Sequence, residues 1–255
     1  AGLSWGQGWS RYKVLDPDGQ VLSSYPLSPA SLDVWAGRSF RLGDGSEPGS
    51  SNSNFVLAAR YAQTRYATRP PKVLDPEGQY SDNSLFLVST GLSIRQYYKE
   101  RYLFRFGNSE DVPEGLLLKF TAGVDKRELT VNRPYLGAEV SRGRNYDGFG
   151  YLSADIAYGT FFQTGDVVDG AFDLRMLFFT DRQTWGRWHF RQFFRFNAVY
   201  GFDKPTYVRL DLNGSQLYGF SSERTGTHKE LFRSETVFYA PWSWLGFRVA
   251  PVILA

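Results

Sequence analysis

A sustained alternation of apolar and polar side chains is the feature that most constrains the fold of this chain. The longest example runs from Arg187 to Tyr200. One set of alternating positions holds Trp188, Phe190, Phe194, Phe196, Ala198 and Tyr200, and the other holds Arg187, His189, Arg191, Phe193, Arg195 and Asn197. Because successive side chains of a β-strand point to opposite faces, this segment predicts a long strand with one apolar and one mainly polar face.

The same alternation recurs along the chain and predicts an all-β protein. Similar patterns occupy Leu32–Leu42, Asn54–Thr68, Ser84–Phe106, Leu116–Asp125, Tyr135–Arg142, Gly150–Gln163, Gly170–Phe179, Thr206–Leu212, Leu231–Tyr239 and Gly246–Leu254. Ser84–Phe106 is long enough for a hairpin, with its turn expected near Gln96–Glu100. The total is about eleven or twelve strands, and no helical stripe competes with them.

The length of these segments favours an antiparallel transmembrane β-barrel. About 9 to 11 tilted residues span a bilayer, whereas strands of soluble proteins centre on about 5 or 6 residues. Half of the residues in a barrel strand can be polar, so the mean hydropathy of −0.37 does not oppose this fold. The aromatic content of 17% agrees with it. The alternative is a soluble β-sandwich or lipocalin-like barrel, and the arginines in register on the polar faces count against it.

Residues 1–255 are expected to form a single transmembrane β-barrel domain in the outer membrane of a Gram-negative bacterium. The strand count fits an incomplete portion of a barrel of about 16 strands. Leu245–Ala255 predicts a strand without a closing turn or a terminal aromatic residue, so sequence is expected to be missing at the C-terminus. The first residues have neither a basic segment nor an apolar run, so the N-terminus is expected to be mature or cut.

The composition argues against several classes of function. The chain has no cysteine, which excludes disulfides, thiolate catalysis and cysteine-based zinc sites. The net charge of +3 is small and scattered, so nucleic-acid binding is not expected. No metal or phosphate-loop spacing occurs, and no cofactor or catalytic residue is expected. The two histidines, His189 and His228, are interpreted as lumen or loop residues, and a lipid hydrolase that uses one of them is the third alternative.

Charged residues of both signs share the face that would line the barrel lumen. The wall residues singled out are Arg191, Arg195, Arg233 and Glu235, together with Arg175, Arg187, Arg248, Asp155, Asp173 and Glu139. Such a wall would either line an anion-preferring channel or pair its charges across the lumen and brace a plugged barrel. Bracing is favoured, because basic and acidic residues alternate between neighbouring strands.

Two segments near the C-terminus carry a family resemblance. Leu212–Phe220, followed by Gly226, is a glycine-rich stretch, and Leu231–Trp242 is a strand that ends in aromatic residues and proline. Together they resemble the C-terminal barrel of the Omp85 (bacterial surface antigen) family, and Phe106–Gly115 and Tyr151–Phe162 look like barrel segments of such proteins from Bacteroidetes. The family's lumen loop motif falls on Gly214, Leu217, Tyr218, Gly219 and Phe220. Tyr218 stands where the family has an arginine, so the family's charged anchor between loop and wall is missing there.

The resemblance implies a barrel that assists insertion or translocation of polypeptides at the outer membrane, without a cofactor. In this mechanism a loop at Gly214–Gly226 folds into the lumen, and a weak seam exposes strand edges that a client strand can join. The implied partners are outer-membrane lipid, lipopolysaccharide, and envelope proteins or polypeptide clients. The alternative is a passive pore, or a structural scaffold barrel that binds other envelope proteins.

Overall fold

The fold is all-β. The computed structural model describes residues 1–15, 20–43, 52–103, 105–128, 131–213, 222 and 224–254. A short 3-10 helix, η1 (Lys72–Leu74), is the only helical element of this part of the chain. The strands are β1 (Gly2–Gln7), β2 (Ser10–Leu15), β3 (Val21–Leu27), β4 (Pro29–Leu42), β5 (Asn52–Tyr66), β6 (Asn83–Arg101), β7 (Ser109–Arg127), β8 (Arg133–Tyr146), β9 (Gly150–Gln163), β10 (Asp166–Thr180), β11 (Gln183–Trp185), β12 (Trp188–Phe202), β13 (His228–Tyr239), β14 (Ser243–Trp244), β15 (Phe247–Arg248) and β16 (Val252–Leu254).

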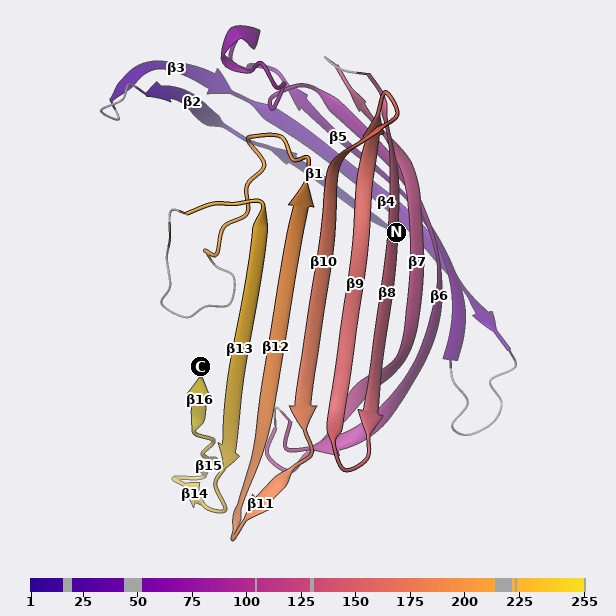
Figure 1. The fold of residues 1–255 in the computed structure, drawn as a ribbon, viewed down its shortest axis with the longest axis vertical. Helices are drawn as coiled ribbons and strands as arrows, with labels where there is room; N and C mark the ends of the chain where they lie inside the picture. The colour runs from indigo at the N-terminus through magenta and orange to yellow at the C-terminus, as the bar shows by residue number, and fades with distance from the viewer. Residues whose placement is uncertain are drawn as a thin grey trace.

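One antiparallel sheet contains twelve of these strands. Its order is β1-β4-β5-β6-β7-β8-β9-β10-β12-β13-β16, and β11 pairs with β12 beside this path. Two small sheets, β2-β3 and β14-β15, lie outside it. Figure 1 shows the long strands side by side as a tall, curved wall. The wall is a succession of hairpins, and the described residues contain no ladder between β1 and β16 at its two ends.

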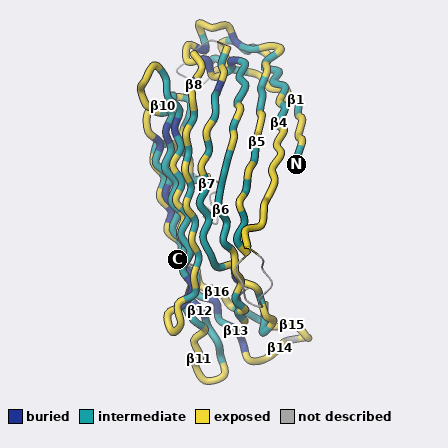
Figure 2. The backbone as a smooth tube through the Cα atoms, turned by 90° about the vertical axis from the view of Figure 1, so that its right-hand side faces the viewer, coloured by how far each residue is buried: buried dark blue, intermediate teal, exposed yellow. Residues whose placement is uncertain are grey.

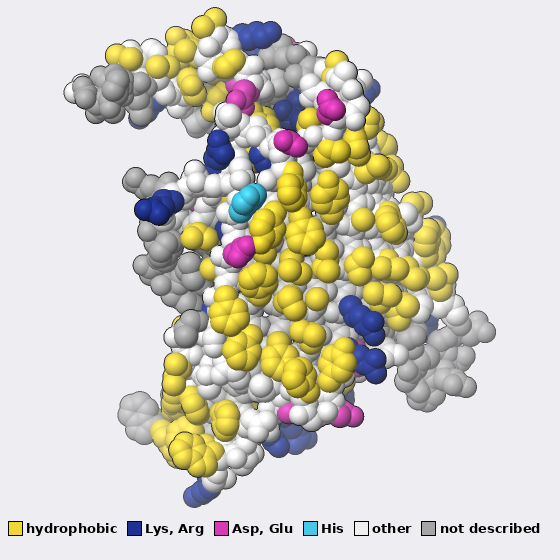
Figure 3. Space-filling view, viewed as in Figure 1, with side chains coloured by type: hydrophobic (Ala, Val, Ile, Leu, Met, Phe, Trp, Pro, Cys, Tyr) yellow, Lys and Arg dark blue, Asp and Glu magenta, His cyan; other side chains and the backbone are white. Residues whose placement is uncertain are grey.

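The wall has two chemically different faces. In β8 the alternation of exposure is complete: outward residues such as Leu136 and Val140 are exposed, and inward residues such as Tyr135 and Glu139 are half-buried. Exposed apolar side chains of other strands point to the same outer face, among them Leu3, Phe40, Phe55, Leu57, Phe86, Phe120, Ile156, Met176 and Phe232. Figure 3 shows this hydrophobic surface over β8 to β13, and Figure 2 shows the alternation along the strands.

The hairpin of β6 and β7 leaves the wall near its lower end, the end of the β8–β9 turn in Figure 1. β7 pairs with β8 only as far as Gly115, whereas β6 and β7 continue together to Arg101 opposite Ser109. Gly115 has φ of 142°, and a Cβ there would lie 1.9 Å from the carbonyl oxygen of Ile94. Glycine permits this approach of two backbones. We call residues 102, 103 and 105–108, at the end of this hairpin, the β6–β7 tip.

Most of the expected strands are present, but three expectations were wrong. Ser84–Phe106 is not a hairpin, because β6 runs unbroken to Arg101 and the chain turns only at the tip. Thr206–Leu212 is not a strand: Leu210 makes an isolated bridge to Gly226, and no strand lies beside the rest. Gly246–Leu254 is not one strand. It contains two short strands, β15 and β16, and Val249–Pro251 between them belongs to neither.

Three strands at the N-terminus were not expected. β1 extends the wall by pairing with β4, and β2 and β3 form a separate hairpin at the upper end. Their sequence, rich in glycine, serine and exposed tryptophan, lacks the long alternation used to find the other strands. The partner strand, rather than local pattern, therefore determines these elements.

Candidate functional site

Charged side chains on the interior face form ion pairs between neighbouring strands. Lys119 on β7 contacts Glu139 on β8 at 2.5 Å. Other pairs are Arg60 with Asp33 at 2.5 Å, Arg195 with Glu235 at 3.0 Å and Arg133 with Asp125 at 2.7 Å. All of these residues occupy inward positions of the register. These ion pairs join neighbouring strands of the wall, and the predicted bracing of a plugged barrel stays a prediction.

The middle of the interior face surrounds a hollow of about 760 Å³. Residues from β4 to β10 contribute to its wall, including Trp35, Arg60, Tyr135, Glu139 and Asp173. Small-molecule sites of this size are mainly apolar with a few polar groups. Here charged and aromatic residues line an open surface, so the hollow does not resemble a dedicated ligand pocket.

The β6–β7 hairpin packs against the lower end of the interior face, and Arg191 of β12 contacts it. The side chain of Arg191 is 0% exposed. Its Nη1 donates to the carbonyl oxygen of Thr180 at 2.9 Å, and its Nη2 donates to that of Arg101 at 3.2 Å. The same Nη2 lies 3.2 Å from Oε1 of Glu100, and the guanidinium lies over the ring of Phe179. A buried guanidinium with these contacts joins the hairpin to β10 and β12.

Apolar packing and two tyrosine hydroxyls complete this contact. The largest buried cluster of the described residues comprises Leu103, Val112, Tyr151, Phe179, Phe193, Val237 and Tyr239. The hydroxyl of Tyr239 donates to the carbonyl oxygen of Leu103 at 2.9 Å, and that of Tyr151 donates to that of Pro113 at 2.8 Å. Residues from the hairpin therefore form one core with β9, β10, β12 and β13. The hairpin thus covers the lower end of the interior face of these strands.

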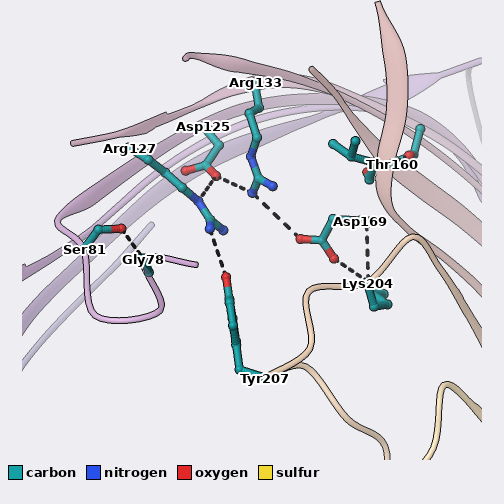
Figure 4. Close-up of polar contacts among 10 residues, drawn as sticks. Gly78, Ser81, Asp125, Arg127, Arg133, Thr160, Asp169, Lys204 and Tyr207 are labelled. Atoms are coloured by element: carbon teal, nitrogen blue, oxygen red, sulfur yellow. Dashed lines mark hydrogen bonds and ion pairs between the residues drawn. The ribbon is translucent and has the colours of Figure 1, made fainter. Parts of the chain in front are cut away.

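A second polar network lies at the upper end of the interior (Figure 4). Its members are Asp125 and Arg127 of β7, Arg133 of β8, Asp169 of β10, and Lys204 and Tyr207 of the β12–β13 connection. Arg133 reaches Asp125 at 2.7 Å and Asp169 at 3.8 Å. Lys204 contacts Asp169 at 2.8 Å, and Nη1 of Arg127 donates to the hydroxyl of Tyr207 at 3.1 Å. The beginning of the β12–β13 connection is thus tied across the interior to β7 and β10.

The sequence-derived wall residues do not all lie together. Arg195 and Glu235 form an ion pair, and Arg233 stands opposite Arg195 in the ladder. Arg191 is separate from them, in the contact with the tip. Arg187 and Arg248 were expected to lie on the wall, but neither does. Arg187 lies in the turn after β11, and Arg248 lies in β15. Gly214, Leu217, Tyr218, Gly219 and Phe220 of the loop motif lie outside the described residues.

The two histidines occupy opposite faces of the wall. His189 points inward, with Nδ1 3.2 Å from Oγ1 of Thr184 and its ring against Tyr102. His228 points outward against the ring of Tyr200. They cannot act on one substrate together. Within the described ranges, no three His, Asp or Glu residues are grouped in a way that could hold a metal ion.

Sequence reasoning missed the residues that join the β6–β7 hairpin to the interior face. Glu100 and Leu103 were placed in or near a hairpin turn, and Tyr239 was only the end of a strand. Gly115 was the one available signal, since a glycine inside a strand pattern often marks a bend or a close backbone approach. The partners of the tip come from residues about 90 to 140 positions later in the chain, which local patterns do not reveal.

Comparison with known proteins found no matching family model, no similar curated protein and no similar solved structure. The resemblance to the Omp85 family therefore stays a prediction from the residues quoted above.

Proposed function

We propose that this chain forms the wall of a transmembrane β-barrel in the outer membrane of a Gram-negative bacterium. The observation that carries this proposal is the outer face, where large apolar side chains such as Phe120 and Phe232, each 60% exposed, point away from the wall. An apolar surface spread over so many strands exceeds the patches that soluble monomers expose. Lipid would cover it, while the ion pairs face an aqueous interior.

The barrel is proposed to be occluded, which makes a structural or scaffold role a better fit than a passive pore. Two observations support this. The β6–β7 tip fills the lower end through a fully buried arginine, and the interior charges are largely paired between neighbouring strands. An open ion pathway would need water-lined space along its whole length. Loops at the two ends would then contact envelope partners.

Cysteine labelling tests the membrane wall, since the chain has no native cysteine. Phe40→Cys and Leu136→Cys change exposed outward residues, and Ser39→Cys changes the exposed inward neighbour of Phe40. In outer membranes we expect the two outward cysteines to resist a water-soluble maleimide and the inward one to react. All three should react after unfolding in urea. Rapid labelling of both outward cysteines in folded, membrane-embedded protein would refute the proposal.

A second candidate function is help with insertion or translocation of polypeptides, as the Omp85-like resemblance implies. The observation that favours it is the short ladder between β13 and β16, which joins Glu235–Val237 to Val252–Leu254. Displacing so short a ladder exposes a strand edge, and such an edge accepts another strand through backbone hydrogen bonds.

This second function predicts a measurable effect on a client barrel. A urea-unfolded eight-stranded outer-membrane protein should fold faster into vesicles that contain this chain than into empty vesicles. Single cysteines at Phe232 and Ser234 should then cross-link to one strand of that client, in a register that shifts with the cysteine. A cysteine at Ile156, in the middle of the wall, is the matched control. Equal folding rates and no cross-link at the β13 edge would leave only the structural role.

A further inference from the structure

A groove opens on the outer face where the β6–β7 hairpin leaves the wall. β8 continues to Tyr146, but its ladder with β7 ends at Gly143 opposite Gly115. The groove between the diverging strands has a volume of about 530 Å³. Its walls include Ile94, Leu116, Arg142 and Arg144. It therefore lies at the lower border of the hydrophobic surface and not in the interior.

Arg142 and Arg144 give this groove a basic side. Both are exposed and both occupy outward positions of β8. Neither forms an ion pair with an acidic side chain of the described residues, in contrast to Lys119 and Arg195 on the interior face. The guanidinium of Arg144 lies over the ring of Tyr146, 5.6 Å from its centroid. Two unpaired arginines thus point toward the surroundings of the barrel.

Charge is unusual on this part of the outer face. The outward residues of the next two strands are uncharged: Leu152, Ala154, Ile156, Tyr158, Phe172, Leu174, Met176 and Phe178. Figure 3 shows basic side chains bordering this hydrophobic surface near its lower end. A charge on the lipid-facing side is unfavourable at the bilayer centre and tolerated near the interface, where it can meet headgroups.

We propose that this groove binds the phosphate of an anionic membrane lipid, with Arg142 and Arg144 as the phosphate ligands. The inference rests on the proposed membrane wall. The two arginines are two residues apart on one face of a strand, so their Cα atoms are separated by about 7 Å, which allows both side chains to reach one phosphate. Arginine matches phosphate oxygens with two parallel N–H donors. Leu116 and Leu152 continue the apolar surface on which the acyl chains would lie.

Glu114 reduces the positive charge of the groove. It also lines the groove, and its Oε1 accepts a hydrogen bond from the backbone N–H of Asn145. The three charged side chains leave a net charge of +1. This residue supplies an opposite test: Glu114→Gln keeps an acceptor for the N–H and removes the negative charge, so lipid phosphate should bind more tightly.

Native mass spectrometry of the full chain in micelles with equal amounts of phosphatidylglycerol and phosphatidylcholine measures the preference. The wild-type protein should retain phosphatidylglycerol preferentially. Arg142→Gln with Arg144→Gln should lower the ratio of the two bound lipids by about fivefold or more, since each basic residue at an anionic surface contributes about this factor. The control variant, Arg11→Gln with Arg175→Gln, also removes two positive charges. One lies in the β2–β3 hairpin and the other on the interior face, so the ratio should stay unchanged.

Each outcome separates this site from the membrane wall on which it depends. Protein that passes the cysteine test but shows no preference for phosphatidylglycerol would overturn the lipid site and leave the wall intact. An equal loss in the control pair would also overturn it, because the effect would then come from net charge alone. Outward cysteines that label rapidly would overturn both proposals. A higher ratio in Glu114→Gln, with a lower one in the arginine pair, supports the site.

Discussion

Two strand pairs of one wall, β4–β5 and β12–β13, differ in what covers their interior faces. Each has a cross-strand ion pair, Arg60 with Asp33 and Arg195 with Glu235. The side chains of the first pair are 53% and 28% exposed, and those of the second are 23% and 24% exposed. Four residues before Arg195 on β12, Arg191 is fully buried in its contact with the β6–β7 hairpin. The alternating pattern is the same in both regions, so the contact with a distant segment decides that Arg191 is buried.

This difference should govern stability. An exposed ion pair contributes little, because water and salt screen it, whereas removing one partner of a buried pair leaves an uncompensated charge. The covered region should therefore respond strongly to substitution, and the open region weakly. Four predictions test or sharpen this contrast.

Arg191→Met should give the largest effect. It leaves Glu100 without its cation and two backbone carbonyl oxygens without a donor, so we expect the free energy of unfolding to fall by about 3 kcal/mol or more. Urea unfolding in micelles, followed by tryptophan fluorescence, measures this change. Arg60→Met in the open region is the matched control and should change it far less. Equal losses in the two variants would contradict the comparison.

Gly115→Ala should weaken the bend that lets the hairpin enter the interior. The new Cβ would meet the carbonyl oxygen of Ile94, and we expect a loss of about 1–3 kcal/mol with loosened tip packing. Hydrogen exchange at the amide groups of the tip would report this release. Gly148, with φ of 77°, is also a positive-φ glycine but has nothing within 4 Å of an added Cβ, so Gly148→Ala is the control without the close contact. A tip that is equally protected in both variants would count against the role of Gly115.

Tyr239→Phe should have a moderate effect, because it removes one buried hydrogen bond to the carbonyl oxygen of Leu103 and keeps the ring. The expected loss in the free energy of unfolding is about 1 kcal/mol. Tyr61→Phe removes a longer, exposed contact to Ser84 at 3.5 Å and should change little. If the two substitutions have the same effect, the tip does not depend on this hydrogen bond.

The smallest effect concerns an exposed tie between two upper loops. The guanidinium of Arg69 donates to both oxygens of Glu128, at 2.6 and 2.9 Å, and lowers the pKa of that carboxyl group. A lowered folded-state pKa means that the tie is complete above the ordinary carboxyl pKa of about 4.3 and is lost as the pH falls through the lower folded value. Cleavage of the β5–β6 loop by an acid-tolerant protease should therefore become faster as the pH is lowered from 5 to 3. Glu128→Gln should remove the pH dependence of this cleavage.

The strands with the longest alternation were predictable from the sequence, and so was the division of the wall into two faces. Gly150–Gln163 was delimited correctly, because a strand that separates lipid-like from polar surroundings must alternate over its whole length. Arg195 and Glu235 form an ion pair between neighbouring strands, while the bracing of a plugged barrel stays a prediction. β1 to β3 were not predictable, because they depend on partner strands and not on a pattern of their own. For β6 the alternation was visible, but not that the strand runs unbroken to Arg101.

The sequence by itself determined which side chains face outward and which face inward, because the two-residue period of a β-strand leaves no other choice once a segment is extended. Only the tertiary structure decided that β6 and β7 leave the wall, that their tip packs against the interior face, and that Arg191 becomes buried while Arg60 stays exposed. These features depend on contacts between residues far apart in the chain. The groove beside Arg142 and Arg144 exists for the same reason, since it forms where one hairpin departs from its neighbour.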